Sequence, residues 1–244
     1  MHTLSELGQG SFSVIGHRGA SAHAPENTAE AYRLAEAHGA DGIEIDVRRT
    51  ADGGLVIHHD AGIEGVGNIV DHRYDDLRTR FPWLLNLDEM LTAAGEMWVN
   101  VEIKNNPGDA DFDPDDHVAA EVVRWIQRND LYERALVSCF NPPTIDKVKE
   151  LDPAIATGWL TDVYLDPRQT VEPAHERGHR AIHPHFSTLT DEVLADLVPS
   201  ASEAGLFVLT WTVDDLATIK RLADAGVTGA FTNDPLAVRT ALSG

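Results

Sequence analysis

The sequence is poor in cysteine and in basic residues, and each shortage excludes a class of protein. Its 244 residues include a single cysteine, Cys139, so no disulfide can form within the chain. This cysteine usage fits a reducing compartment. There are 19 Lys and Arg residues against 40 Asp and Glu residues, which gives a net charge of −21 at pH 7. Nucleic acids and anionic membranes bind basic surfaces, so the sequence predicts neither nucleic-acid binding nor stable membrane association.

Long apolar stretches are also absent. No segment approaches the roughly 18 apolar residues of a membrane-spanning helix. Residues 1–10 lack the basic and apolar regions of a secretory signal peptide, so we expect a cytoplasmic protein. Hydrophobic residues nevertheless make up 43% of the chain, which is enough to bury a full core.

The chain does contain a regular alternation of strand-length and helix-length segments. Eight short apolar runs, rich in β-branched residues, predict strands buried on both faces, as in a parallel sheet. They lie at residues 12–15, 42–47, 97–103, 135–138, 155–159, 180–182, 206–211 and 229–231. Amphipathic stretches between them predict helices, most clearly at residues 29–38, 118–128, 191–204 and 215–225.

Residues at the expected helix ends support this alternation. Asn141, Asp166 and Asp234 each precede a proline, a pairing that predicts a capped helix start. Four glycines each close a helical stretch, as the left-handed residue that ends many helices does. They are Gly39, Gly178, Gly205 and Gly226. Eight strand–helix units without a flexible linker predict one (β/α)8 TIM barrel, an α/β domain spanning residues 1–244. An open, doubly wound sheet has the same local pattern and remains the alternative.

One segment departs from the alternation. Residues 50–54 read Thr-Ala-Asp-Gly-Gly and precede a short apolar run at 55–58, which predicts a hairpin after the second strand. Residues 60–82 show no clear period and predict an irregular excursion. In a barrel such an excursion leaves from the C-terminal face, where active sites lie.

Polar residues stand at the ends of the first two predicted strands. His17 and Arg18 follow the first strand between two glycines, which would let an anion approach closely. They could equally cap the strand end and reach solvent. In the second strand Glu44 and Asp46 point to the same side, because side chains alternate along a strand. They face the barrel interior if Ile43, Ile45 and Val47 face the helices.

The third strand carries a matching set, because Asn100, Glu102 and Lys104 share one face. Glu102 can therefore join the carboxylates of the neighbouring second strand. Buried carboxylates need protons or a cation, and a hard divalent ion is the natural partner of oxygen ligands. Lys104 could meet the anionic part of a substrate or could form an ion pair with Glu102.

The predicted hairpin can place His59 over the barrel mouth, beside His17. Two histidines next to a metal form a plausible acid/base pair, although they could instead be metal ligands. A carboxylate-rich site suits Mg²⁺ or Ca²⁺ better than zinc. With Arg18 and Lys104, the set fits metal-assisted attack on a phosphorus centre.

These residues belong to motifs that resemble the glycerophosphodiester phosphodiesterase family, within the wider group of phosphatidylinositol-phospholipase-like barrels. The motifs are His-Arg-Gly-Ala-Ser at 17–21, Pro-Glu-Asn-Thr at 25–28, Glu-Ile-Asp-Val at 44–47, His-Asp at 59–60, Val-Glu-Ile-Lys at 101–104, Val-Leu-Thr-Trp-Thr-Val at 208–213 and Thr-Asn-Asp-Pro at 232–235. They follow the family order over residues 13–236, and the ordered set is specific even though each motif alone is weak.

The resemblance implies an enzyme of lipid and glycerol metabolism that cleaves small-molecule glycerophosphodiesters to sn-glycerol 3-phosphate and an alcohol. It also implies one divalent cation, Mg²⁺ or Ca²⁺, with Mn²⁺ as a further candidate. The implied site residues are His17 and His59 as the general acid/base pair, Glu44, Asp46 and Glu102 as metal ligands, and Arg18, Lys104 and Trp211 as substrate contacts. Trp211 could instead only pack the barrel rim.

Two departures from the family pattern concern the substrate. The family often has an acidic, Thr-rich stretch with an arginine after the His-Asp pair, whereas residues 61–67 here read Ala-Gly-Ile-Glu-Gly-Val-Gly. The excursion before Glu102 is also short, so any cap over the site should be small. The sequence leaves open the alcohol group, the metal used, the oligomeric state, a cyclic phosphate intermediate and the role of His183 and His185.

Three other functions share part of this pattern. A lysophospholipase D would cleave a lipid-tailed diester at the same site, and an apolar entrance beside Trp211 would favour it. A phosphate-ester-binding barrel without catalysis would not need both His17 and His59. A metal-dependent sugar isomerase would share the barrel and the carboxylates, but it would not need paired histidines with Arg18 and Lys104.

Overall fold

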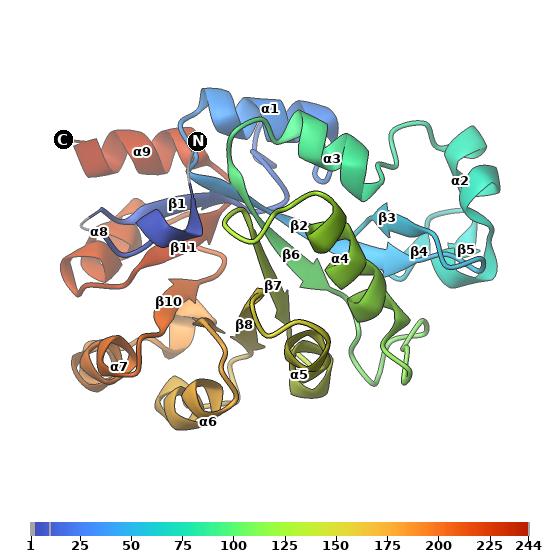
Figure 1. The fold of residues 1–244 in the computed structure, drawn as a ribbon. Helices are drawn as coiled ribbons and strands as arrows, with labels where there is room; N and C mark the ends of the chain where they lie inside the picture. The colour runs from blue at the N-terminus through green and yellow to red at the C-terminus, as the bar shows by residue number, and fades with distance from the viewer. Residues whose placement is uncertain (1–2, 10, 244) are drawn as a thin grey trace.

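The strands of the computed structural model close into a ring, as Figure 1 shows, and the structure describes residues 3–9 and 11–243. The ring closes because β1 (Ser13–Gly16) pairs in parallel with both β2 (Gly42–Arg49) and β11 (Gly229–Thr232). The strands between β2 and β11 are, in order, β6 (Trp98–Ile103), β7 (Ala135–Cys139), β8 (Ala156–Thr161), β9 (Ala181–Pro184) and β10 (Phe207–Thr210). This closure confirms the (β/α)8 barrel and excludes the open sheet.

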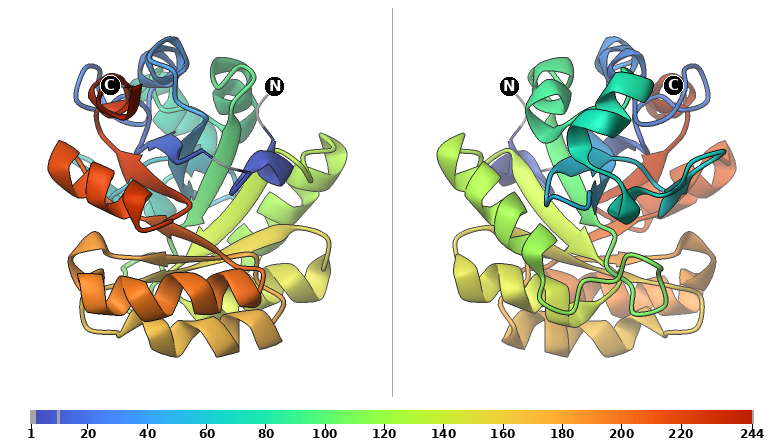
Figure 2. Two further views of the ribbon diagram at one scale, coloured as in Figure 1. Left: turned by 90° about the vertical axis from the view of Figure 1, so that its left-hand side faces the viewer. Right: turned by 90° about the vertical axis from the view of Figure 1, so that its right-hand side faces the viewer.

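Helices form the outer layer of the barrel, as both views in Figure 2 show. They are α1 (Ala29–Ala37), α3 (Leu87–Ala93), α4 (His117–Arg128), α5 (Pro142–Leu151), α6 (Val171–Glu176), α7 (Asp191–Glu203), α8 (Leu216–Asp224) and α9 (Pro235–Ser243). Short 3-10 helices are η1 (Leu4–Glu6), η2 (Ile69–Asp71), η3 (Pro167–Thr170) and η4 (Phe186–Thr188). The four most clearly predicted helices are confirmed. Among the described residues no helix is long and apolar enough to cross a membrane.

The predicted helix ends are confirmed with one exception. All four glycines have positive φ angles: Gly39 +79°, Gly178 +72°, Gly205 +70° and Gly226 +86°. Asp166 accepts the N–H of Arg168, and Asp234 accepts that of Ala237, so both act as caps. The helix start after Asn141 is confirmed, but its side chain does not cap α5, because the amide donates to Thr144 Oγ1 at 3.1 Å instead.

Side chains along each strand point alternately toward the surrounding helices and into the barrel interior. Ile43, Ile45 and Val47 of β2 pack in a cluster that also contains buried residues of α1, α3 and α4. A separate cluster fills the barrel interior with side chains from successive strands and from the N-terminal segment. It contains Leu4, Leu7, Ile15, Trp98, Leu136, Ala181, Leu209 and Phe231. Because the apolar positions of β2 face outward, Glu44 and Asp46 point into the barrel, as predicted.

His183 of β9 lies inside the barrel and is fully buried. The His183 ring lies 5.3 Å from the ring of Phe231. It also leaves room only for a glycine at position 158, because an added Cβ there would lie 2.5 Å from His183 Nε2. Within the described part of the chain, neither ring nitrogen has a hydrogen-bond partner. Burial lowers the pKa of His183 to about 3.

This burial predicts an acid-sensitive fold. The unfolded chain protonates His183 near the ordinary pKa of 6.5, whereas the folded chain does not do so until about 3. The free energy of unfolding should therefore fall as the pH drops below 6.5, with His183 contributing up to about 1.4 kcal/mol per pH unit. His183→Leu should remove this part of the slope in urea unfolding measured at several pH values. His175→Gln, which changes an exposed histidine of α6, is the control. An unchanged slope in His183→Leu would contradict the assignment.

The excursion after β2 is more ordered than predicted. The hairpin is confirmed, because β3 (Leu55–Ile57) pairs antiparallel with β2. Beyond it the chain forms a small hairpin of β4 (Gly62–Ile63) and β5 (Gly67–Asn68), and then α2 (Tyr74–Arg80). The irregular expectation was wrong for α2, because this short helix buries only Leu77 and so has no visible period. In Figure 2 the teal segment around α2 faces the viewer only in the right-hand view, on one side of the barrel.

Candidate active site

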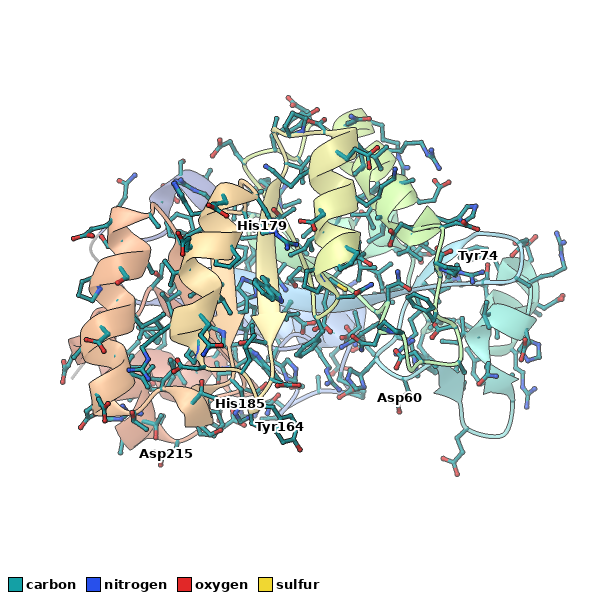
Figure 3. All side chains as sticks on the ribbon, turned by 90° about the horizontal axis from the view of Figure 1, so that it is seen from below. Asp60, Tyr74, Tyr164, His179, His185 and Asp215 are labelled. Atoms are coloured by element: carbon teal, nitrogen blue, oxygen red, sulfur yellow. The ribbon has the colours of Figure 1, made fainter. Side chains whose placement is uncertain are left out.

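The candidate site lies at the carboxyl ends of the barrel strands. Figure 3 shows Asp60, Tyr164 and His185 along one edge of the molecule, the edge toward which the visible strand points, while His179 lies away from it. The predicted site residues lie near the carboxyl end of a barrel strand or in the segment that follows it, except Glu44, which lies deeper, in the first half of β2. This is the face on which barrel enzymes carry their catalytic groups.

A tight turn after β1 brings the backbone of Arg18 to the carboxylates. Arg18 and Gly19 have φ angles of +57° and +87°, both in the left-handed region. A Cβ at Gly19 would lie 2.7 Å from the carbonyl carbon of Ala31 in α1, so only glycine fits there. The turn directs the Arg18 N–H to Glu44 Oε2 at 2.9 Å. The glycine of the His-Arg-Gly motif is therefore needed for this close approach to α1.

Three carboxylates meet inside the barrel mouth. Parallel pairing places Asp46 of β2 opposite Glu102 of β6, with Glu44 one step lower on β2. Each of the three offers an oxygen within 4.8 Å of the others, and all three side chains are buried. No described residue forms a hydrogen bond to Glu44 Oε1. The structure thus brings together the three residues that the sequence predicted as metal ligands.

Two basic side chains neutralise part of this cluster. Lys104 Nζ lies 2.8 Å from Asp46 Oδ1 and also bonds Glu102, so the predicted Glu102–Lys104 ion pair is present. Arg18 Nε lies 3.3 Å from Asp46 Oδ2, and its Nη1 pairs with Glu26 at 2.9 Å. When every group is ionised, the three carboxylates face only the two cations of Lys104 and Arg18, which leaves an excess of negative charge.

The titration behaviour of the cluster reflects this excess. Burial, reinforced by the charges of Asp46 and Glu102, raises the pKa of Glu44 well above its ordinary value. Burial also raises the pKa of Glu102, although Lys104 opposes the shift. At Asp46 burial acts in the same direction, but Lys104 and Arg18 outweigh it and lower the pKa. A buried oxygen triad short of positive charge fits a hard divalent cation.

Asn27 orients the central carboxylate, a role that the sequence did not reveal. Its Nδ2 donates to Asp46 Oδ2 at 2.8 Å, and its Oδ1 accepts the Tyr32 hydroxyl at 2.9 Å. Asn27 is buried and has a φ angle of +56°. The Pro-Glu-Asn-Thr motif marked this position, but a contact across 19 residues has no local signal.

The two predicted acid/base histidines have different partners. His17 Nδ1 lies 2.8 Å from Asn233 Oδ1, a neutral amide oxygen. Burial and the nearby Arg18 lower the pKa of His17. His59 Nδ1 lies 2.7 Å from the carboxylate of Asp60, and its side chain is 36% exposed. The structure therefore gives one histidine a neutral partner and the other an anionic partner.

Trp211 both packs the rim and lines a cavity. Its Nε1 donates to the His183 carbonyl at 2.9 Å, and its ring meets those of Phe140 and His185 edge to face. The cavity beside it has a volume of about 570 Å³. The lining residues are Asn106, Phe140, Pro142, Trp159, Leu160, Thr161, Asp162, Leu165 and Trp211. His185 therefore belongs to the rim, whereas His183 lies below it.

Comparison with known proteins gives one consistent result. Residues 17–237 match the profile of the Glycerophosphoryl diester phosphodiesterase family. The chain is 30% identical to a glycerophosphodiester phosphodiesterase of Caldanaerobacter subterraneus subsp. tengcongensis, in an alignment covering 91% of this chain and 94% of that protein. A glycerophosphodiester phosphodiesterase structure from Parabacteroides distasonis superposes with a TM-score of 0.82 at 26% identity, covering 96% of this chain and 97% of that one.

A further solved structure contains a ligand. It is an Oleispira antarctica phosphodiesterase in complex with the product sn-glycerol-3-phosphate. It superposes with a TM-score of 0.81 at 25% identity and covers 96% of this chain and 98% of that one.

Proposed function

Because this chain belongs to the glycerophosphoryl diester phosphodiesterase family, we propose that it hydrolyses glycerophosphodiesters to sn-glycerol 3-phosphate and an alcohol. It is a phosphoric diester hydrolase, and we propose that residues 1–244 form one domain. The observation that carries the proposal is the buried triad of Glu44, Asp46 and Glu102. The product bound to the Oleispira antarctica relative supports the choice of substrate.

The triad would hold one divalent cation, Mg²⁺ or Ca²⁺, with Mn²⁺ as a further candidate. When bound, this cation would withdraw charge from the phosphoryl oxygens. Arg18 and Lys104 ion-pair with the triad, and they are the proposed contacts of the substrate phosphate. Asn27 positions Asp46 and would stay in place throughout the reaction.

His17 and His59 would move the protons. The low pKa of His17 leaves its ring neutral at pH 7, so it can accept the proton of the nucleophile, either the glycerol 2-hydroxyl or water. His59 is bonded to the Asp60 carboxylate and can donate a proton to the departing alcohol oxygen. The bond between phosphorus and that oxygen breaks as the new phosphorus–oxygen bond forms. If the 2-hydroxyl is the nucleophile, this step gives a cyclic phosphate, which water then opens to glycerol 3-phosphate.

The direct test is release of glycerol 3-phosphate from a panel of glycerophosphodiesters, each assayed with Mg²⁺, Ca²⁺ and Mn²⁺. Stoichiometric release of glycerol 3-phosphate and alcohol with at least one cation is the expected result. Release of a glycerol bearing no phosphate, or no turnover of any diester with any cation, would overturn the proposal.

A second substrate is favoured by the cavity beside Trp211. Six of its nine lining residues are apolar, and the loop that borders it carries Val163 and Tyr164, which are 47% and 91% exposed. We propose that this entrance admits a hydrocarbon tail on the glycerol, so that lysophospholipids are also cleaved. Each methylene that enters an apolar cavity adds about 0.8 kcal/mol of binding energy.

Lysophosphatidylcholine and glycerophosphocholine distinguish the two substrate classes. Tyr164→Ser together with Val163→Ser should lower kcat/KM for the lysophospholipid while leaving glycerophosphocholine turnover unchanged. Leu151→Ser removes a similarly exposed apolar side chain at the end of α5 and is the matched control. Equal loss on both substrates, or no turnover of lysophosphatidylcholine, would exclude the tail-binding role.

A further inference from the structure

The geometry around His17 points to a positioning relay, and we propose that Asp214 and Asn233 fix the His17 proton on Nδ1 and leave Nε2 free to accept a proton. The proposal builds on the acid/base role of His17 proposed above. Both relay residues lie outside the predicted site set. Asp214 follows β10, and Asn233 follows β11 directly.

The orientation of the Asn233 amide follows from its partners. Asn233 Nδ2 lies 2.7 Å from Asp214 Oδ2, and a carboxylate oxygen can only accept. The amide nitrogen must therefore face Asp214. The carboxylate is itself held by two further donors, because Asp214 Oδ1 accepts the Asn233 N–H at 2.8 Å and the Thr232 hydroxyl at 2.8 Å.

The amide orientation in turn determines the tautomer of His17. With Nδ2 directed to Asp214, the Asn233 oxygen faces His17 Nδ1 at 2.8 Å. An amide oxygen has no proton to donate, so Nδ1 must carry the hydrogen. The Ser21 hydroxyl lies 2.8 Å from the same oxygen and adds a second donor. In a neutral imidazole Nε2 is then the unprotonated nitrogen.

A neutral amide at this position also matters electrostatically. A carboxylate there would stabilise the charged imidazolium and keep His17 protonated, whereas the amide fixes the ring without a negative charge. Burial, Arg18 and Lys104 lower the pKa of His17, and they outweigh Asp46 and the hydrogen bond to Asn233, which raise it. Asn233 thus positions His17 and leaves it ready to accept a proton at neutral pH.

Two variants test the relay. Asn233→Ala removes the acceptor of the Nδ1 proton. The double exchange Asp214→Asn with Asn233→Asp allows the same hydrogen bonds, with only the bond between the two residues reversed, and places a carboxylate beside His17. Asp215→Asn changes only the neighbouring cap of α8 and is the matched control. All are compared with the wild-type enzyme loaded with Mg²⁺, after thermal melting has shown that each variant is folded.

Histidine ¹⁵N NMR and the pH dependence of kcat/KM are the measurements. Wild type should show the Nδ1–H tautomer at His17, identified by the signal missing from His17→Asn. Asn233→Ala should mix the tautomers and lower kcat by roughly 10²-fold, the cost of a misplaced catalytic group, with a smaller change in KM. The double exchange should retain the Nδ1–H tautomer of His17. Because its carboxylate stabilises the imidazolium, the acidic limb of the kcat/KM profile should move upward by about one pH unit or more.

Several outcomes would overturn the relay. An Nε2–H tautomer in wild type, near-wild-type kcat in Asn233→Ala, or an unshifted acidic limb in the exchange variant would each do so. If Asn233→Ala does not fold, the His17 tautomer in wild type and the pH profile of the exchange variant still test the relay. If His17→Ala is inactive while Asn233→Ala is fully active, the relay fails and the proposed function stands. If His17→Ala is also fully active, the acid/base role of His17 fails as well.

Discussion

Removal of divalent cations with excess EDTA is expected to lower the rate of glycerophosphodiester hydrolysis by roughly 10³-fold, and Mg²⁺, Ca²⁺ or Mn²⁺ is expected to restore it. The reason is the charge balance of the triad. Three buried carboxylates face the cations of Lys104 and Arg18, and the substrate phosphate adds another negative charge. One unbalanced pair of like charges 4 Å apart costs about 4 kcal/mol near a protein surface, which corresponds to this factor in rate.

Glu44→Gln is the sharpest variant for this prediction. Among the residues described, Glu44 Oε1 has no hydrogen-bond partner, so the variant should disturb the fold little while removing one charged ligand. Calorimetric titration with Mg²⁺ or Ca²⁺ should show one bound ion in wild type and markedly weaker binding in the variant. Glu30→Gln changes an exposed glutamate in the first turn of α1 and should bind the ion as wild type does.

Two results would count against the metal site. Full activity after exhaustive chelation would remove the cation from the reaction. Equal ion affinity in wild type and in Glu44→Gln would place the ion elsewhere in the protein. The two measurements are independent, because calorimetry reports binding even in an inactive variant.

The fold was predictable because its signals are local. Parallel strands buried on both faces are continuous apolar runs, and four glycines with positive φ angles mark helix ends. Ring closure is different in kind, because it depends on pairing between β1 and β11, more than two hundred residues apart. The count of eight units favoured closure without showing it. Helix α2 was missed because a short helix with one buried leucine has no period to detect.

The candidate site was predictable to the extent that strand alternation determines it. Alternation places Glu44 and Asp46 on one face, and adjacency of β2 and β6 brings Glu102 beside Asp46. Asn27, Asp214 and Asn233 act through side-chain hydrogen bonds across the mouth, and their direction depends on loop geometry. The same limit applies to the histidines. The sequence proposed a pair, whereas the amide beside His17 and the carboxylate beside His59 became visible only in three dimensions.

His17→Ala and His59→Ala are each expected to lower kcat by roughly 10²- to 10⁴-fold, the contribution of a positioned acid or base. The double variant should be little slower than the more impaired single variant, because groups that act in one step are not additive. His58→Ala is the matched control, since this adjacent histidine bonds the Asp60 carbonyl and packs against Trp83. Near-wild-type turnover in either single variant would remove that histidine from the mechanism.

The leaving group separates the two roles. If His59 donates the proton to the departing alcohol, its loss should matter little for a substrate whose leaving group is p-nitrophenol, which departs as an anion without protonation. The rate of His59→Ala should then recover most of the deficit on glycerophospho-p-nitrophenol, while His17→Ala should remain impaired, because its nucleophile still needs a base. Equal impairment of both variants on both substrates would show that the histidines do not divide the work in this way. Recovery of the rate in His17→Ala alone would reverse the two roles. His59, which is bonded to Asp60, would then be the base, and His17, which is bonded to Asn233, would be the acid.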